Sequence, residues 1–248
     1  MVRPLWIIGD VHASSPDAEL FRLLTAAVER QADLLFMGDL FEAWLGPERF
    51  WSNAMRPLLE TLRQCRRAGL RVTFVQGNRD YLTAGLAGDV FDDVWTKPSL
   101  RTIGGQPTWV LHGDGIDARD HAYRTWRTIS RGRVANALLR GLPSRWGQRL
   151  PTWTAHRLES TNRAFKDGQL PEAALCEVAR EARRAGAHRC LLGHFHTGAN
   201  LDFDGTTVRI VPGWRETRTV VVATADYLRP HKMEDLLAPS PTEVASGT

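Results

Sequence analysis

Five short polar clusters, each placed just past an apolar run, constrain this chain more than any other feature of its sequence. In chain order the clusters are Asp10-Val11-His12, Gly38-Asp39, Gly77-Asn78-Arg79-Asp80, His112-Gly113-Asp114 and Gly193-His194-Phe195-His196. The apolar runs that precede them are Leu5–Ile8, Leu34–Met37, Val72–Val75, Trp109–Leu111 and Leu191–Leu192. Such runs are typical of buried strands, and open α/β folds bind ligands just past the strand ends. We therefore expect the five clusters to meet at one edge of a sheet.

Helical patterns alternate with these predicted strands. Ser15-Pro16 is expected to start the first helix, residues 52–68 form the second and Gly69 ends it. A third helix is expected from Pro171 to Gly186, followed by a hairpin that turns at Asp204-Gly205 and a strand near Val220–Ala223. This order predicts a layered α/β domain.

Residues 116–170 interrupt the alternation between the fourth and fifth clusters. They are mostly helical in pattern, with turns marked by Gly132, Gly141-Leu142-Pro143 and Pro151. We predict a helical insertion, or cap, within a single domain that spans residues 1–231. Residues 232–248, which contain much Pro, Ser, Thr and Ala, are expected to form a disordered tail.

The positive charge of the chain is concentrated in this insertion. Residues 116–170 hold ten Arg and one Lys against four acidic side chains, whereas the remainder holds 21 basic and 24 acidic ones. The excess favours a polyanionic partner, such as phosphate groups, a nucleic acid or an anionic membrane face. No run of eighteen apolar residues is present, no signal peptide is expected, and three cysteines without CxxC spacing are typical of a reducing, cytoplasmic compartment.

The side chains in the five clusters suit two divalent cations. Asp10 and His12 are one residue apart, so both can face the same ion from a strand end, and Asp39 is a natural bridging carboxylate. The amide oxygen of Asn78 adds a ligand without adding negative charge. The remaining candidate ligands are His112, His194 and His196. Nitrogen and oxygen ligands without thiolate favour Mn²⁺, Fe²⁺, Zn²⁺ or Co²⁺ over Ca²⁺.

The order and spacing of these clusters resemble the calcineurin-like metallophosphoesterases over roughly residues 5–223. The resemblance implies an α/β/β/α sandwich with two metal ions and a helical cap insertion. It assigns Asp10, His12, Asp39 and His196 to one ion. It assigns Asp39, Asn78, His112 and His194 to the other. A single cluster such as Gly-Asp also occurs as an ordinary turn, but five in this order are characteristic of the superfamily.

Arg79 indicates which kind of leaving group the site serves. Many superfamily members have a histidine after the asparagine, whereas a guanidinium cannot act as a general acid at neutral pH but can clamp a phosphate oxygen. A leaving group that needs little protonation, such as the phosphate of a pyrophosphate, fits this change. The alternative is that Arg79 forms a salt bridge with a nearby carboxylate.

Together with residues 38–46, this motif resembles the UDP-2,3-diacylglucosamine pyrophosphohydrolases of lipid A biosynthesis. That resemblance implies hydrolysis to UMP and 2,3-diacylglucosamine 1-phosphate with Mn²⁺, on the cytoplasmic side of the inner membrane as a peripheral protein. It implies catalytic roles for Asn78, Arg79 and His112. The substrate contacts that it implies are Arg79, Asp120, Tyr123, Arg157, Ser160, Asn162, Lys166 and His194. The chain departs from the family pattern at residues 116–119, 195–198 and 212–214.

The sequence leaves two other functions open. The same chemistry could serve a soluble nucleotide or a nucleic acid, in which case Trp126, Trp146 and Trp153 would stack on bases. Those tryptophans lie among leucines, which favours contact with acyl chains. We therefore expect no nucleic acid as a partner. A non-catalytic scaffold is disfavoured because all seven candidate ligands are present.

Overall fold

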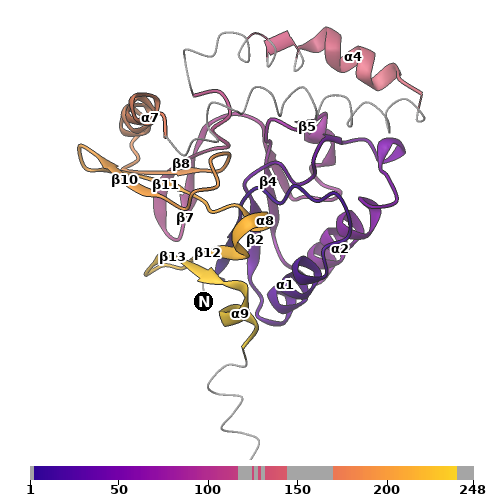
Figure 1. The fold of residues 1–248 in the computed structure, drawn as a ribbon, viewed down its shortest axis with the longest axis horizontal. Helices are drawn as coiled ribbons and strands as arrows, with labels where there is room; N and C mark the ends of the chain where they lie inside the picture. Colours follow the sequence, from indigo (N-terminus) through magenta and orange to yellow (C-terminus); the bar gives the residue numbers. More distant parts are fainter. Residues whose placement is uncertain (1–2, 117–124, 126–127, 130–131, 144–169, 239–248) are drawn as a thin grey trace, which may run out of the picture.

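Two β-sheets lie face to face in the computed structural model, which describes residues 3–116, 125, 128–129, 132–143 and 170–238 (Figure 1). The first sheet has the strand order β13-β12-β1-β2-β4-β6, and the second has the order β10-β11-β9-β8-β7. A third, two-stranded sheet pairs β3 with β5. The strands are β1 (Leu5–Ile8), β2 (Asp33–Phe36), β3 (Trp44–Leu45), β4 (Val72–Val75), β5 (Asp80–Tyr81), β6 (Asp93–Trp95), β7 (Ser99–Ile103), β8 (Gln106–Leu111), β9 (Arg189–Leu192), β10 (Asn200–Phe203), β11 (Thr206–Ile210), β12 (Thr219–Ala223) and β13 (Leu228–Lys232).

Alternating side chains build three hydrophobic layers. Ile7 of β1 and Leu35 of β2 point between the sheets, where they meet Leu191 of β9. Their neighbours Trp6 and Ile8 join the outer layer beneath the helices of the first sheet. The outer face of the second sheet is covered by α7 (Glu172–Arg184). The predicted α/β/β/α sandwich is therefore confirmed.

The helices on the first sheet are α1 (Ala18–Glu29) and α2 (Arg56–Arg67), which lie side by side in Figure 1. The cap of α1 is Asp17 rather than Ser15, because the Asp17 carboxylate accepts bonds from the backbone N–H groups of Glu19 and Leu20. Helix α2 begins later than expected, at Arg56. The predicted hairpin turn is present, with positive φ at both Asp204 and Gly205.

The folded chain extends beyond the expected boundary at residue 231. Strand β13 pairs with β12, and helix α9 (Met233–Leu237) follows it directly. Met233 and Leu236 are buried against the core beneath α1, as their spacing of three residues on one helix face allows. The expectation of a disordered tail is therefore wrong for residues 232–237.

Within the predicted cap, the described residues include helix α4 (Arg133–Gly141). Leu139 and Leu142 pack against a small core cluster formed by Leu45, Phe50 and Tyr81. The side chain of Arg49 also bonds the backbone carbonyl of Arg140. These contacts attach α4 to the β3–β5 region of the sandwich.

Candidate metal centre

Loops that follow five strands bring the predicted ligands together. Asp10 and His12 follow β1, Asp39 follows β2 and Asn78 follows β4. His112 directly follows β8, and His194 and His196 follow β9. Since β1, β2 and β4 are parallel neighbours and β8 and β9 are parallel in the facing sheet, their ends meet at one edge of the sandwich.

The first group of ligand atoms comes from Asp10, His12 and His196. The two imidazole Nε2 atoms of His12 and His196 face each other at 3.4 Å. The Nε2 atom of His196 also lies 3.3 Å from an oxygen of Asp10. All three residues offer a ligand atom within 4.8 Å of the others. Buried nitrogen and carboxylate atoms that converge in this way fit a divalent cation.

The second group comprises Asp39, His112 and Asn78, with Asp10 close by. His112 Nε2 lies 3.0 Å from Asn78 Oδ1 and 3.8 Å from Asp39 Oδ1. The other oxygen of Asp39 lies 4.0 Å from His12 Nε2. The Asp39 carboxylate therefore lies between the two groups, where a bridging ligand would be required.

His194 completes this side of the site. Its ring packs edge-on against that of His112, with centroids 5.3 Å apart. Its backbone N–H donates to both carboxylate oxygens of Asp10, at 3.1 and 3.0 Å. The structure thus brings together all seven residues that the sequence predicted as ligands.

The backbone at the site is strained. Five of the seven predicted ligands have positive φ although none is glycine: Asp10, His12, Asp39, His194 and His196. A non-glycine residue in this conformation costs about 1–3 kcal/mol, and such residues concentrate at functional sites. The positive φ of these five residues therefore supports a functional site at the ends of the strands.

Gly77 and Asp80 hold the loop that carries Asn78 against the loop that carries Asp39. A Cβ atom on Gly77 would lie 2.2 Å from Asp39 Oδ1, so only glycine permits this approach. The Asp80 carboxylate accepts hydrogen bonds from the backbone N–H groups of Asp39 and Gly77, both at 2.8 Å. Burial and the charge of Asp39 raise the pKa of Asp80 to about 7.

The environment of the site shifts the pKa values of its histidines in different directions. Burial, reinforced by the nearby His112, lowers the pKa of His194 to about 4. Burial also lowers the pKa of His12. Burial acts in the same direction on His196, but contacts with Asp10 and Glu216 outweigh it and raise its pKa to about 10. At neutral pH His12 and His194 are therefore neutral imidazoles, the form that binds metal ions.

Arg79 forms the ion pair that the sequence left open as an alternative. Its Nη1 atom donates to the backbone oxygen of Glu42 at 3.0 Å and to the Glu42 carboxylate at 3.2 Å. Its Nε atom lies 3.7 Å from Asp39 Oδ2. Arg215 also contacts Glu42. The guanidinium is thus held next to the central carboxylate with most of its surface buried.

Several residues around the site were not predicted, namely Glu42, Asp80, Arg215 and Glu216. Glu42 lies in the stretch 38–46 and Asp80 in the third cluster, both of which the sequence had singled out. Arg215 and Glu216 directly follow Pro212-Gly213-Trp214, where the chain departs from the family pattern. The predicted substrate contacts Asp120, Tyr123, Arg157, Ser160, Asn162 and Lys166 lie outside the described residues.

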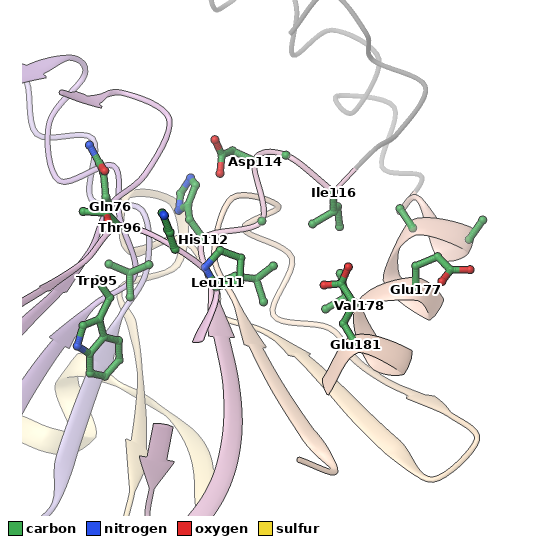
Figure 2. Close-up of a pocket in the computed structure, with 17 residues that line it drawn as sticks. Gln76, Trp95, Thr96, Leu111, His112, Asp114, Ile116, Glu177, Val178 and Glu181 are labelled. Carbon is green, nitrogen blue, oxygen red and sulfur yellow. The ribbon is translucent and has the colours of Figure 1, made fainter. Parts of the chain in front are cut away.

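A cavity of about 650 Å³ adjoins the site on the side of His112. Figure 2 shows it between Trp95 and Thr96, which end and follow β6, and Glu177 and Glu181 of α7. Asp114 borders the cavity above His112 in the same view. Its polar lining therefore includes several carboxylates.

The sequence of this chain is similar to one protein family and to several known proteins. The model of the family described as calcineurin-like phosphoesterase matches residues 3–198. The UDP-2,3-diacylglucosamine hydrolase of Chromohalobacter salexigens is 30% identical over 242 residues, which cover 92% of this chain and 96% of that protein. The protein of the same name from Neisseria meningitidis is 28% identical over 86% of this chain and 90% of its own length. The one from Pseudomonas aeruginosa is 29% identical over 82% and 86% respectively.

Proposed function

This chain belongs to the calcineurin-like phosphoesterase family, and from that premise we propose that it hydrolyses the pyrophosphate bond of UDP-2,3-diacylglucosamine. The products would be UMP and 2,3-diacylglucosamine 1-phosphate. The observation that carries this proposal is the guanidinium of Arg79, buried beside Asp39 at the position where a general acid would otherwise be expected.

We propose two Mn²⁺ ions as cofactors. One would be held by Asp10, His12, Asp39 and His196. The other would be held by Asp39, Asn78, His112 and His194. When bound, such ions lower the pKa of water and neutralise the charge that develops on a phosphoryl group. The fit rests on two groups of ligand atoms, those of Asp10, His12 and His196 and those of Asp10, Asp39 and His112, which in each group already lie within 4.8 Å of one another.

Different residues of the chain would then contact different parts of the substrate. Arg79 presents a fixed cation beside Asp39, which suits a phosphate oxygen and leaves the departing phosphate unprotonated. Glu42 accepts from Nη1 of Arg79 and so restricts the rotation of the guanidinium. Asn78 provides a neutral oxygen where an additional carboxylate would repel the substrate.

The cavity beside His112 suits the uncharged part of a nucleotide sugar. Among the described lining residues the acidic side chains Asp114, Glu177 and Glu181 outnumber the one lysine, Lys97, an excess that disfavours a phosphate, and carboxylates can accept hydrogen bonds from sugar hydroxyls. A chain of phosphodiesters along this wall is disfavoured for the same reason. Replacing Glu177 with Ala should raise the KM for the nucleotide substrate and leave turnover of bis-(p-nitrophenyl) phosphate unchanged.

Helix α4 supports a lipid substrate. Val134 and Leu138, one turn apart, are 75% and 68% exposed, and Ile129 is 61% exposed. Val134 and Leu138 lie on one face of α4, so the described part of the cap exposes apolar side chains, which suits acyl chains or a bilayer surface. None of the helices formed by the described residues has the length and apolar character needed to cross a membrane. The exposed apolar side chains lead us to propose a peripheral association with the cytoplasmic face of the inner membrane.

Phosphorus NMR tests the proposal directly. The purified protein, Mn²⁺ and UDP-2,3-diacylglucosamine in mild detergent should give the signal of UMP, and Asp39→Ala should abolish it. Turnover of bis-(p-nitrophenyl) phosphate without release of UMP would retain a phosphodiesterase but refute the glycolipid substrate.

A further inference from the structure

The short helix α8 (Trp214–Thr217) is fixed against the metal-ligand loops. The backbone N–H of Trp214 donates to the Gly9 carbonyl at 2.8 Å, and its indole Nε1 donates to Asp17 at 3.0 Å. The backbone N–H of Gly213 donates to the carbonyl of His196 at 3.2 Å. Since Trp214 is also fully buried, the first turn of this helix has little freedom to move.

This anchoring places Glu216 against the outer nitrogen of His196. The distance from Glu216 Oε1 to His196 Nδ1 is 3.4 Å. The inner nitrogen, Nε2, faces the ligand atoms of Asp10 and His12 at 3.3 and 3.4 Å. The imidazole of His196 is therefore held between a carboxylate outside the site and the ligand atoms inside it.

Gly213 leaves the space in which this contact forms. A Cβ atom at this position would lie 2.3 Å from Glu216 Oε2 and 3.0 Å from both Cβ and Cγ of His196. A side chain at this position would have to displace the Glu216 carboxylate, which is the end of a flexible side chain, and would crowd the base of the His196 ring. The absence of a side chain at residue 213 thus serves the same pair of residues that the helix brings together.

We propose that Glu216 is a positioning residue that prepares His196 to bind a metal ion. The Glu216 carboxylate faces Nδ1, so it accepts the N–H there and keeps that proton in place, and the proton on Nε2 is the one that a metal ion would displace. The same contact fixes the orientation of the ring, so that Nε2 would be directed at the ion. The inference rests on the metal site in the proposed function, but it extends that site to a residue outside the ligand set.

The neighbouring residue on α8 distinguishes this role from a general effect of the helix. Arg215 contacts Glu42, on the Arg79 side of the site, rather than a histidine. Glu19 contacts Arg218 at the end of α8, with 2.6 Å between Oε2 and Nε. Glu19 and Glu216 have similarly exposed side chains, at 46% and 50%. Glu19 therefore provides a matched control for the removal of a carboxylate near this helix.

Titration calorimetry of the metal-free protein with Mn²⁺ tests the inference without any substrate. Glu216→Ala should weaken one of the two binding events by about 10–100-fold and leave the other unchanged. Glu216→Gln should lose less affinity, because its amide oxygen can still accept the Nδ1–H bond. For Glu19→Ala, the dissociation constants of both ions should stay within about twofold of those of the unmodified protein. This is well below the tenfold change, equal to about 1.4 kcal/mol, that is the smallest effect expected for Glu216→Ala.

The outcomes separate this inference from the proposed function. If Glu216→Ala binds both ions as tightly as the unmodified protein, Glu216 has no positioning role, although the metal site stands. An equal loss in Glu19→Ala would also overturn the inference, since any carboxylate near α8 would then suffice. If the unmodified protein binds no Mn²⁺, the proposed cofactor fails together with the inference. If Glu216→Ala lowers the unfolding temperature of the metal-free protein, the Mn²⁺ affinity of Glu216→Gln tests the positioning role instead. An affinity of Glu216→Gln as low as that of Glu216→Ala would overturn the inference, and a smaller loss supports it.

Discussion

Replacing Gly77 with Ala should disable the metal centre by a displacement that can be worked out from the structure. The added Cβ would lie 2.2 Å from Asp39 Oδ1 and 2.5 Å from the Asp39 backbone nitrogen. To reach even a 3.0 Å contact, the carboxylate has to move by about 0.8 Å. Gly77 does not have positive φ, so the effect is one of space rather than backbone strain.

The size of this displacement sets the expected effects. Metal–ligand distances tolerate about 0.2 Å, so Mn²⁺ affinity should fall by at least about tenfold. A misplacement of about 1 Å at a reacting centre lowers kcat/KM by about 100-fold. Overpacking of this kind should also lower the free energy of unfolding by about 1–3 kcal/mol.

Calorimetric titration with Mn²⁺ and denaturant unfolding of the metal-free protein measure the two effects separately. Gly85→Ala is the matched control, because nothing lies within 4 Å of a Cβ at that position. It should change stability by no more than about 0.5 kcal/mol and leave Mn²⁺ affinity unaltered. The reasoning is refuted if Gly77→Ala binds Mn²⁺ as tightly as Gly85→Ala does.

Three further predictions concern Arg79, the cysteines and the core. Arg79→Lys should lower kcat/KM for the pyrophosphate substrate by about 100-fold and leave Mn²⁺ affinity unchanged. The reason is that an ammonium cannot contact both Glu42 and a phosphate as a guanidinium can. A kcat/KM equal to that of the unmodified protein would contradict this. Burial raises the pKa of Cys65 to about 11 and that of Cys190 to about 12. Both folded thiols should resist alkylation at pH 9, and stability to denaturant should fall as pH rises from 9 through 11, since unfolded thiols ionise first. Leu59→Ala, at a fully buried position between α2 and the first sheet, should cost about 2–5 kcal/mol in the same unfolding assay, and a cost below about 1 kcal/mol would contradict the packing described.

The strand ends and the ligand clusters could be predicted from the sequence because both signals are local. An apolar run such as Leu5–Ile8 indicates a buried strand, and Asp10 and His12 follow it within a few residues. The parallel pairing of β1, β2 and β4 then brings their ends together without further information. This is why all seven predicted ligands meet in the structure.

The residues that support the ligands could not be predicted in this way. Glu42 and Arg215 are 173 residues apart, and their contact depends on how α8 packs beside the first sheet. The contact of Glu216 with His196 likewise follows from the backbone bonds of Gly213 and Trp214, which no local pattern encodes. Helix α9 was missed because five residues are too few to show helical periodicity, although Met233 and Leu236 are buried in the core.

The Mn²⁺ electron paramagnetic resonance spectrum of the loaded protein distinguishes a dinuclear site from separate ions. Asp39 lies between the two groups of ligands, so we expect two ions per chain, about 3.5–4 Å apart and magnetically coupled. Asp39→Asn should weaken or remove this coupling. A spectrum of isolated Mn²⁺ ions that is the same in Asp39→Asn would contradict the dinuclear site.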